Sequence, residues 1–151
     1  MQNIQIAISQ DGIYEEVIKT TAYIGGKNVD QNGHTLYDQV FVTDVDKEML
    51  DRFLLDAVEN ASLVLSEVIK SVDSDDEGYL IFDLLMTDNF PKKLQSDLQQ
   101  AISSYLQHQI IAEWCGVSAK GEAEKYTTEA AVMLRLVNSI IYKRCRPIRN
   151  F

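Results

Sequence analysis

Two short segments of the chain carry the hydrophobic pattern of β-strands. In residues 3–9 the apolar side chains Ile4, Ile6 and Ile8 alternate with smaller or polar ones, which is the period-two pattern of a half-buried strand. Residues 79–86 form a nearly unbroken apolar run that only Asp83 interrupts, and this run has the length of a strand rather than of an independent helix. Residues 36–42 are either a weak strand or an extended lead-in.

Three longer segments carry the pattern of amphipathic helices, with apolar residues at steps of three and four. Thr43 or Asp44 caps the first, Pro91 lies in the first turn of the second, and Pro147 prevents the third from continuing. The predicted helices span residues 44–72, 91–115 and 118–144. Tyr105, Trp114 and Tyr126 fall on their apolar stripes, and we expect these aromatic side chains to anchor the core.

A shorter helix is predicted from Ile13 to about Ile24, with Ile13 and Val17 on its buried side. Gly25 and Gly26 are expected to end it, because glycine commonly terminates helices. Residues 71–78 are rich in acids, and we interpret them as a linker that does not pack against the core.

Together these patterns predict a mainly α, α+β fold: a helical bundle of three long helices and a shorter one, with a small β element. A chain of 151 residues with 46% apolar content can bury a core of its own without a metal or a disulfide. We predict a single domain over residues 1–142 and a basic C-terminal tail at residues 143–151.

Net charge and composition narrow the function classes. The charge of −9 at pH 7 argues against a broad nucleic-acid-binding face. No apolar run approaches the ~20 residues of a membrane span, and the N-terminus lacks a signal-peptide pattern, so we expect a cytoplasmic protein without a membrane. Cys115 and Cys145 are too few for a disulfide framework and are predicted to be free thiols at helix ends.

The candidate chemical motifs are incomplete. Asp73 to Gly78 begins like a calcium loop, but Leu84 occupies the twelfth position, where such a loop needs a bidentate Glu. His34 and His108 lie far apart in sequence without a companion at ligand spacing, and we expect both on the surface. Because no nucleophile, base or metal set stands out, we predict no catalytic residue, no cofactor and no metal: the protein is not expected to be an enzyme.

The C-terminal tail is the one strongly basic segment. It holds four of the 14 Lys+Arg residues and none of the 23 Asp+Glu residues, so the preceding residues carry a net charge of −13. One interpretation is that the tail cations are solvated or complement the last helix dipole. The other is that the tail inserts into a partner, with Arg forks binding carboxylates or phosphates and an apolar plug at the end. The candidate interface residues of the tail are Lys143, Arg144, Arg146, Arg149 and Phe151.

Three segments resemble a group of small virion proteins from tailed phages and prophages of gut Bacteroidetes, including the crAss-like phages. They are YEEVIKTTAYIG at residues 14–25, TDVDKEMLDRF at residues 43–53, and residues 126–147, which end in YKRCRP. The group is similar in role to head–tail connector or neck ring subunits. The resemblance implies a virion protein, assembled in the host cytoplasm, that forms a ring of twelve copies below the portal and contacts neighbouring neck or tail proteins.

The charge pattern agrees with that role. An acidic lumen lets DNA pass without binding its phosphates, and segregated charge favours head-to-tail contacts that close into rings. The N-terminal strand, with Ile4, Ile6 and Ile8, is a further interface candidate because it can add to a neighbour's sheet. The alternative is an acidic cytoplasmic inhibitor that mimics DNA; a tail-terminator subunit or an enzyme with an unrecognised site comes after it.

Overall fold

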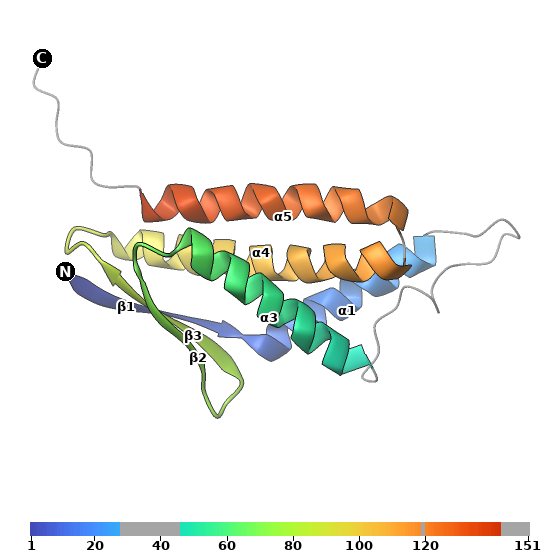
Figure 1. Cartoon of the computed structure of the whole chain (residues 1–151), viewed down its shortest axis with the longest axis horizontal. Helices are drawn as coiled ribbons and strands as arrows, with labels where there is room; N and C mark the ends of the chain where they lie inside the picture. The colour runs from blue at the N-terminus through green and yellow to red at the C-terminus, as the bar shows by residue number, and fades with distance from the viewer. Residues whose placement is uncertain (28–45, 119, 143–151) are drawn as a thin grey trace, which may run out of the picture.

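The computed structural model describes residues 1–27, 46–118 and 120–142, and this part of the chain confirms the mainly α, α+β fold class. Figure 1 shows a small sheet below α4, α5 on the opposite side of α4, and α3 packed beside α4. The predicted segment 36–42 and the predicted tail 143–151 lie outside the described residues. The described elements are β1 (Gln2–Ser9), α1 (Gln10–Lys27), α3 (Lys47–Val64), β2 (Ile69–Ser74), β3 (Tyr79–Met86), α4 (Lys92–Ser118) and α5 (Lys120–Ile141).

The three strands form one antiparallel sheet in the order β1-β3-β2, so that β3 is central. The register pairs Ile4 with Leu84 and Ile6 with Phe82, which places the apolar side chains of both strands on one face. This face is buried against the helices. The two strands predicted from the alternating and continuous apolar patterns are therefore confirmed.

The central helix of the core is α4. Leu98, Ile102 and Leu106 are fully buried along it, at the three- and four-residue steps expected of its stripe. Tyr105, Trp114 and Tyr126 are also buried, which confirms their prediction as core anchors. On its other side α4 packs along the length of α5 (Figure 1).

The first long helix is shorter than predicted. The sequence pattern runs from residue 44 to 72, whereas α3 ends at Val64 and the backbone N–H of Leu65 closes its last turn on Ala61 O. Residues 65–68 then turn, and β2 begins at Ile69. The physical reason is that β3, buried in the middle of the sheet, needs backbone partners on both sides, and β2 supplies them on one side.

The acidic segment 71–78 is not an unpacked linker, and this prediction was wrong. Its first half belongs to β2 and its second half is the turn of a β2–β3 hairpin. Asp75 Oδ1 accepts hydrogen bonds from the backbone N–H groups of Glu77 (3.0 Å) and Tyr79 (2.8 Å). Gly78 closes the turn with a φ of 85°, the left-handed conformation that three-residue hairpin loops place at a glycine.

Two predicted helix ends were also wrong. α1 continues through Gly25 and Gly26 to Lys27, and α4 continues through Gly116 to Ser118. In both cases a fully buried side chain precedes the glycine, Ile24 in α1 and Cys115 in α4. Tertiary packing supplies most helical stability in proteins, and it outweighs the tendency of these glycines to end a helix. α5 lies within its predicted range of residues 118–144.

Candidate interaction surface

An open groove runs between α3 and β2, and we call it the α3–β2 groove. It consists of two hollows, the larger of about 600 Å³, and Val58 and Val72 line both of them. The groove is therefore continuous from the end of α3 to the region of the β2–β3 hairpin. Its lining side chains include Leu55, Glu59 and Leu63 from α3 and Lys70, Asp73 and Ser74 from β2.

One wall of the groove is an outward-facing stripe of α3. Leu55, Glu59 and Leu63 follow one another at four-residue steps, so they lie on the same side of the helix. Leu55 is 60% exposed and Leu63 is 73% exposed. Neither leucine was predicted as a surface residue, because the inward-facing stripe of α3 dominates its hydrophobic pattern. The four-residue spacing of Leu55, Glu59 and Leu63 is the signal in the sequence that places them on one side of the helix.

The other wall is the outer edge of β2. Among the described residues the sheet ends at this strand. The backbone N–H of Asp75 bonds to Tyr79 O at 2.9 Å, so these two residues form a hydrogen-bonded pair. Hydrogen-bonded pairs alternate with non-bonded ones along an antiparallel ladder, and the register therefore makes Asp73 and Ser71 the next residues of β2 that bond to β3. The backbone groups of Val72 and Ser74 consequently point away from β3. The strand edge offers these groups to a further strand.

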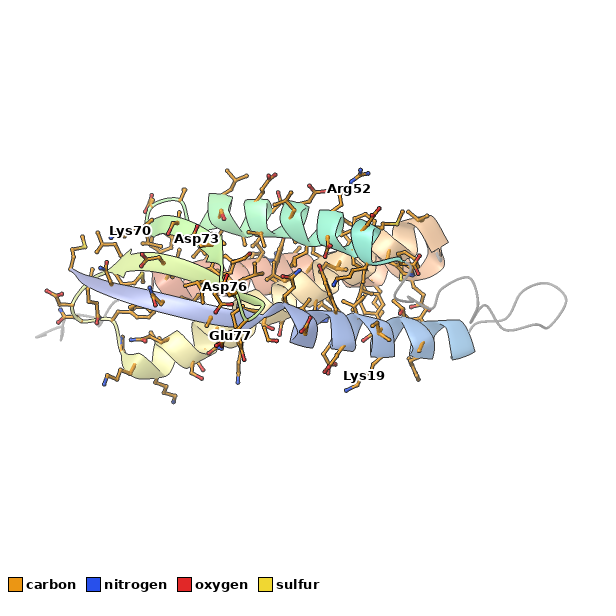
Figure 2. All side chains as sticks on the ribbon, turned by 90° about the horizontal axis from the view of Figure 1, so that it is seen from below. Lys19, Arg52, Lys70, Asp73, Asp76 and Glu77 are labelled. Carbon is orange, nitrogen blue, oxygen red and sulfur yellow. The ribbon has the colours of Figure 1, made fainter. Side chains whose placement is uncertain are left out.

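The charged side chains that line the groove are mainly acidic. Asp51, Glu59 and Asp73 line it, against the single lining cation Lys70 in the described part of the chain. The hairpin turn at the end of β2 carries the exposed acids Asp76 and Glu77, and Figure 2 shows Asp76 between Asp73 and Glu77. Exposed acids on several backbone elements thus meet at one surface, which favours a cationic partner.

Asp51 is held in place from α1. Tyr14 donates a hydrogen bond from its hydroxyl to Asp51 Oδ1, and Gln10 Nε2 approaches the same carboxylate at 3.5 Å. Burial of the Tyr14 ring and the neighbouring carboxylate both raise the pKa of Tyr14 far above its ordinary value. The hydroxyl therefore stays protonated and remains a donor. This contact fixes the acidic end of the groove to the first helix.

The described chain ends beside the opposite end of the groove. Tyr142 directly follows α5, and its hydroxyl donates to Glu67 Oε2 at 2.6 Å. Glu67 lies in the turn between α3 and β2, next to the groove residues Leu63 and Ile69. The predicted tail residues Lys143, Arg144, Arg146, Arg149 and Phe151, which lie outside the described residues, follow Tyr142 in the sequence.

The β1 strand, predicted as an interface candidate, has its apolar side chains on the buried face of the sheet. Ile4, Ile6 and Ile8 are each 3% exposed, so their side chains belong to the chain's own core and are not available to a neighbour in this fold. Only the backbone edge of β1 faces outward in the described sheet. Part of this edge is occupied, because Gln99 Nε2 of α4 donates to Ala7 O at 2.7 Å. Of the two sheet edges, β2 is the more open one.

Cys115 and His108 each pack against neighbouring residues of the fold. Cys115 is a free, buried thiol whose pKa is raised to about 11, first by burial and then by Glu122. His108 is partly buried between helices rather than on the surface: its Nε2 lies 3.1 Å from Glu129 Oε2, and its ring stacks on Tyr126. His34 and Cys145 lie outside the described residues.

The described residues offer neither a metal cluster nor a membrane-spanning helix. Residues 1–27, 46–118 and 120–142 contain no cluster of three or more His, Cys, Asp or Glu side chains suited to a metal ion. Over the same residues, each helix falls short of the length and apolar character that crossing a membrane requires.

Comparison with protein-family models, with curated proteins and with solved structures gives no match to this chain.

Proposed function

We propose that this chain is a virion structural protein of a tailed bacteriophage, a head–tail connector (neck ring) subunit that forms a ring below the portal. The observation that carries the proposal is the α3–β2 groove with its acidic side chains beside an open strand edge, in a chain whose last nine residues hold four cations and no acid. A groove and a tail of opposite charge are different surfaces, so contacts between identical copies are heterologous. Heterologous contacts close into rings when the rotation permits.

The acidity of the chain supports passage of DNA rather than binding of DNA. Residues before the tail carry a net charge of −13, and exposed acids such as Asp76 and Glu77 project from the hairpin (Figure 2). Acidic walls repel phosphates, so a ring built from these subunits lets DNA slide between capsid and tail. The proposal includes no catalytic activity, cofactor or metal.

The partners follow from the resemblance. They are further copies of the chain in a ring of twelve, the portal on one side, and a neighbouring neck or tail protein on the other. The protein then resides in the virion after assembly in the host cytoplasm, and no contact with a membrane is required.

Two measurements test the proposal. Native mass spectrometry and negative-stain images of the purified chain should show closed rings, at high protein concentration or with the portal protein present. Phages that lack the gene should accumulate DNA-filled heads without tails. A protein that stays monomeric under all of these conditions and is absent from purified virions would contradict the proposal.

The main alternative gives a different result in the same experiments. An acidic inhibitor that mimics DNA forms a discrete complex with a host DNA-binding enzyme, and DNA competes with it for that enzyme. Such a protein forms no ring and is dispensable for the completed particle.

A further inference from the structure

The α3–β2 groove has features that match one segment of this chain. Its edge strand presents the backbone groups of Val72 and Ser74, its α3 wall presents exposed apolar side chains, and its rim is acidic. A segment that fits must be able to extend, must carry cations, and must offer a few apolar side chains. Residues 143–151 combine Lys143, Arg144, Arg146 and Arg149 with Ile148 and Phe151.

We infer that the α3–β2 groove of one copy receives the C-terminal segment 143–151 of the next copy, which adds to β2 as an extra strand. The inference rests on the self-association in the proposed function and specifies which surfaces meet. Because side chains alternate along a strand, Arg146 and Ile148 face the α3 wall with Glu59 and Leu55, whereas Arg149 and Phe151 lie on the opposite side of the strand with Asp73.

Proline fixes which residues of the segment pair with β2. Pro147 has no N–H group, so it can sit in an added strand only where its nitrogen faces away from the partner. Since groups alternate along a strand, the N–H groups of Arg146, Ile148 and Asn150 are the ones that bond to β2. Nine extended residues span at most about 30 Å, more than the ~20 Å of a six-residue strand.

Chain direction favours a neighbouring copy over the segment's own groove. α5 ends beside the α3–β2 turn, where Tyr142 bonds to Glu67, and Figure 1 shows β2 running from that turn back in the opposite sense to α5. Docking in the same chain therefore requires a full reversal directly after Tyr142. Pro147 disfavours a helical turn at Arg146 and biases it toward an extended conformation, so the segment has little room for that reversal.

The test uses two charge-reversed forms of the full-length chain. One carries Glu59→Lys and Asp73→Lys in the groove, and the other carries Arg144→Glu, Arg146→Glu and Arg149→Glu in the tail. In each form groove and tail have the same sign, so we expect self-association, measured by sedimentation, to weaken at least tenfold. Mixed in equal amounts, the two forms should associate again, because each offers a tail of opposite sign to the other's groove.

A matched control distinguishes this contact from a general charge effect. Glu15→Lys with Glu124→Lys changes the net charge by the same amount as the groove form, at exposed positions outside the groove, and it should leave association within twofold of the original chain. Equal weakening by the control, or no restoration in the mixture, would overturn the inference. Weakening by neither reversed form would overturn it too, while rings of the original chain would still support the proposed function.

A monomeric original chain would count against both the inference and the ring.

Discussion

Neighbouring leucines on α3 have opposite surroundings. Leu54 is 4% exposed in the core, whereas Leu55 is 60% exposed in the α3–β2 groove. We expect Leu54→Ala to lower the free energy of unfolding by about 2–5 kcal/mol, because it leaves a cavity in the core. Leu55→Ala should cost less than about 0.5 kcal/mol, as is usual for surface changes. Urea unfolding measures both, and equal losses would contradict this assignment of the two faces.

Cys115 makes the stability of the fold depend on alkaline pH. Burial raises the pKa of its thiol to about 11 from an ordinary value of 9.0. Below pH 9 the thiol is protonated in both the folded and the unfolded chain, and its contribution to the free energy of unfolding is complete. As the pH rises toward 11 the unfolded chain loses this proton first, so the free energy of unfolding falls. The loss is on the order of 2 kcal/mol.

The measurement is the urea midpoint at pH 8 and at pH 11 for the original chain and for Cys115→Ala. The substitution leaves a small cavity at both pH values, so only the difference between the two midpoints reports the thiol. Buried tyrosines such as Tyr14 lower stability in the same direction in both proteins. Midpoints that fall equally with pH would show that the thiol does not contribute.

At the scale of elements, glycines in two different backbone conformations give opposite predictions. Gly78 closes the β2–β3 hairpin at a φ of 85°, where a side chain is strained, so Gly78→Ala should destabilise by about 1–2 kcal/mol. Gly26 lies inside α1 with no atom within 4 Å of an added Cβ. Gly26→Ala should therefore stabilise by up to about 1 kcal/mol. Thermal unfolding measures both, and a loss at Gly26 would indicate that α1 ends before it.

The hairpin turn also bears on calcium. The Asp75 carboxylate already accepts two backbone N–H groups of its own turn, and Leu84 is buried in β3 at the place of the missing bidentate acid. We predict that calorimetric titration shows no saturable binding at micromolar calcium. A stoichiometric heat that disappears in Asp75→Asn would contradict this prediction.

Periodicity predicted the elements better than their ends. The alternation around Ile6 and the stripes of α4 and α5 were sufficient, because each buried face repeats along its element. The β2 strand was missed because Val68, Ile69 and Val72 fit a helical stripe as well as a strand edge. Only the need of β3 for a partner separates the two, and that need is a property of the folded sheet. The same ambiguity concealed the α3–β2 groove.

At the scale of the whole molecule, the charge of the chain is divided between residues 1–142, which carry −13, and residues 143–151, which carry +4. The described core reaches Ile140 and Ile141 at the end of α5, and we expect the tail cations to add little to its stability. A single exposed ion pair contributes at most about 1 kcal/mol. The same contact repeated between every pair of copies in a ring adds up, and it can decide whether the ring closes.

Replacing Arg144, Arg146 and Arg149 by Ala separates these two roles. We expect the thermal midpoint of the isolated chain to stay within about 2 °C, a shift that corresponds to less than 1 kcal/mol for a domain of this size. Completion of phage particles, measured by plaque titre and by electron microscopy, should be blocked. Lys92→Ala with Lys93→Ala, two exposed cations at the start of α4, is the control and should assemble normally. The triple variant removes positive charge without introducing negative charge. Normal particles from it would show that the tail cations are solvated and have no role in assembly. A lowered midpoint with normal particles would instead assign these arginines to the subunit's own fold.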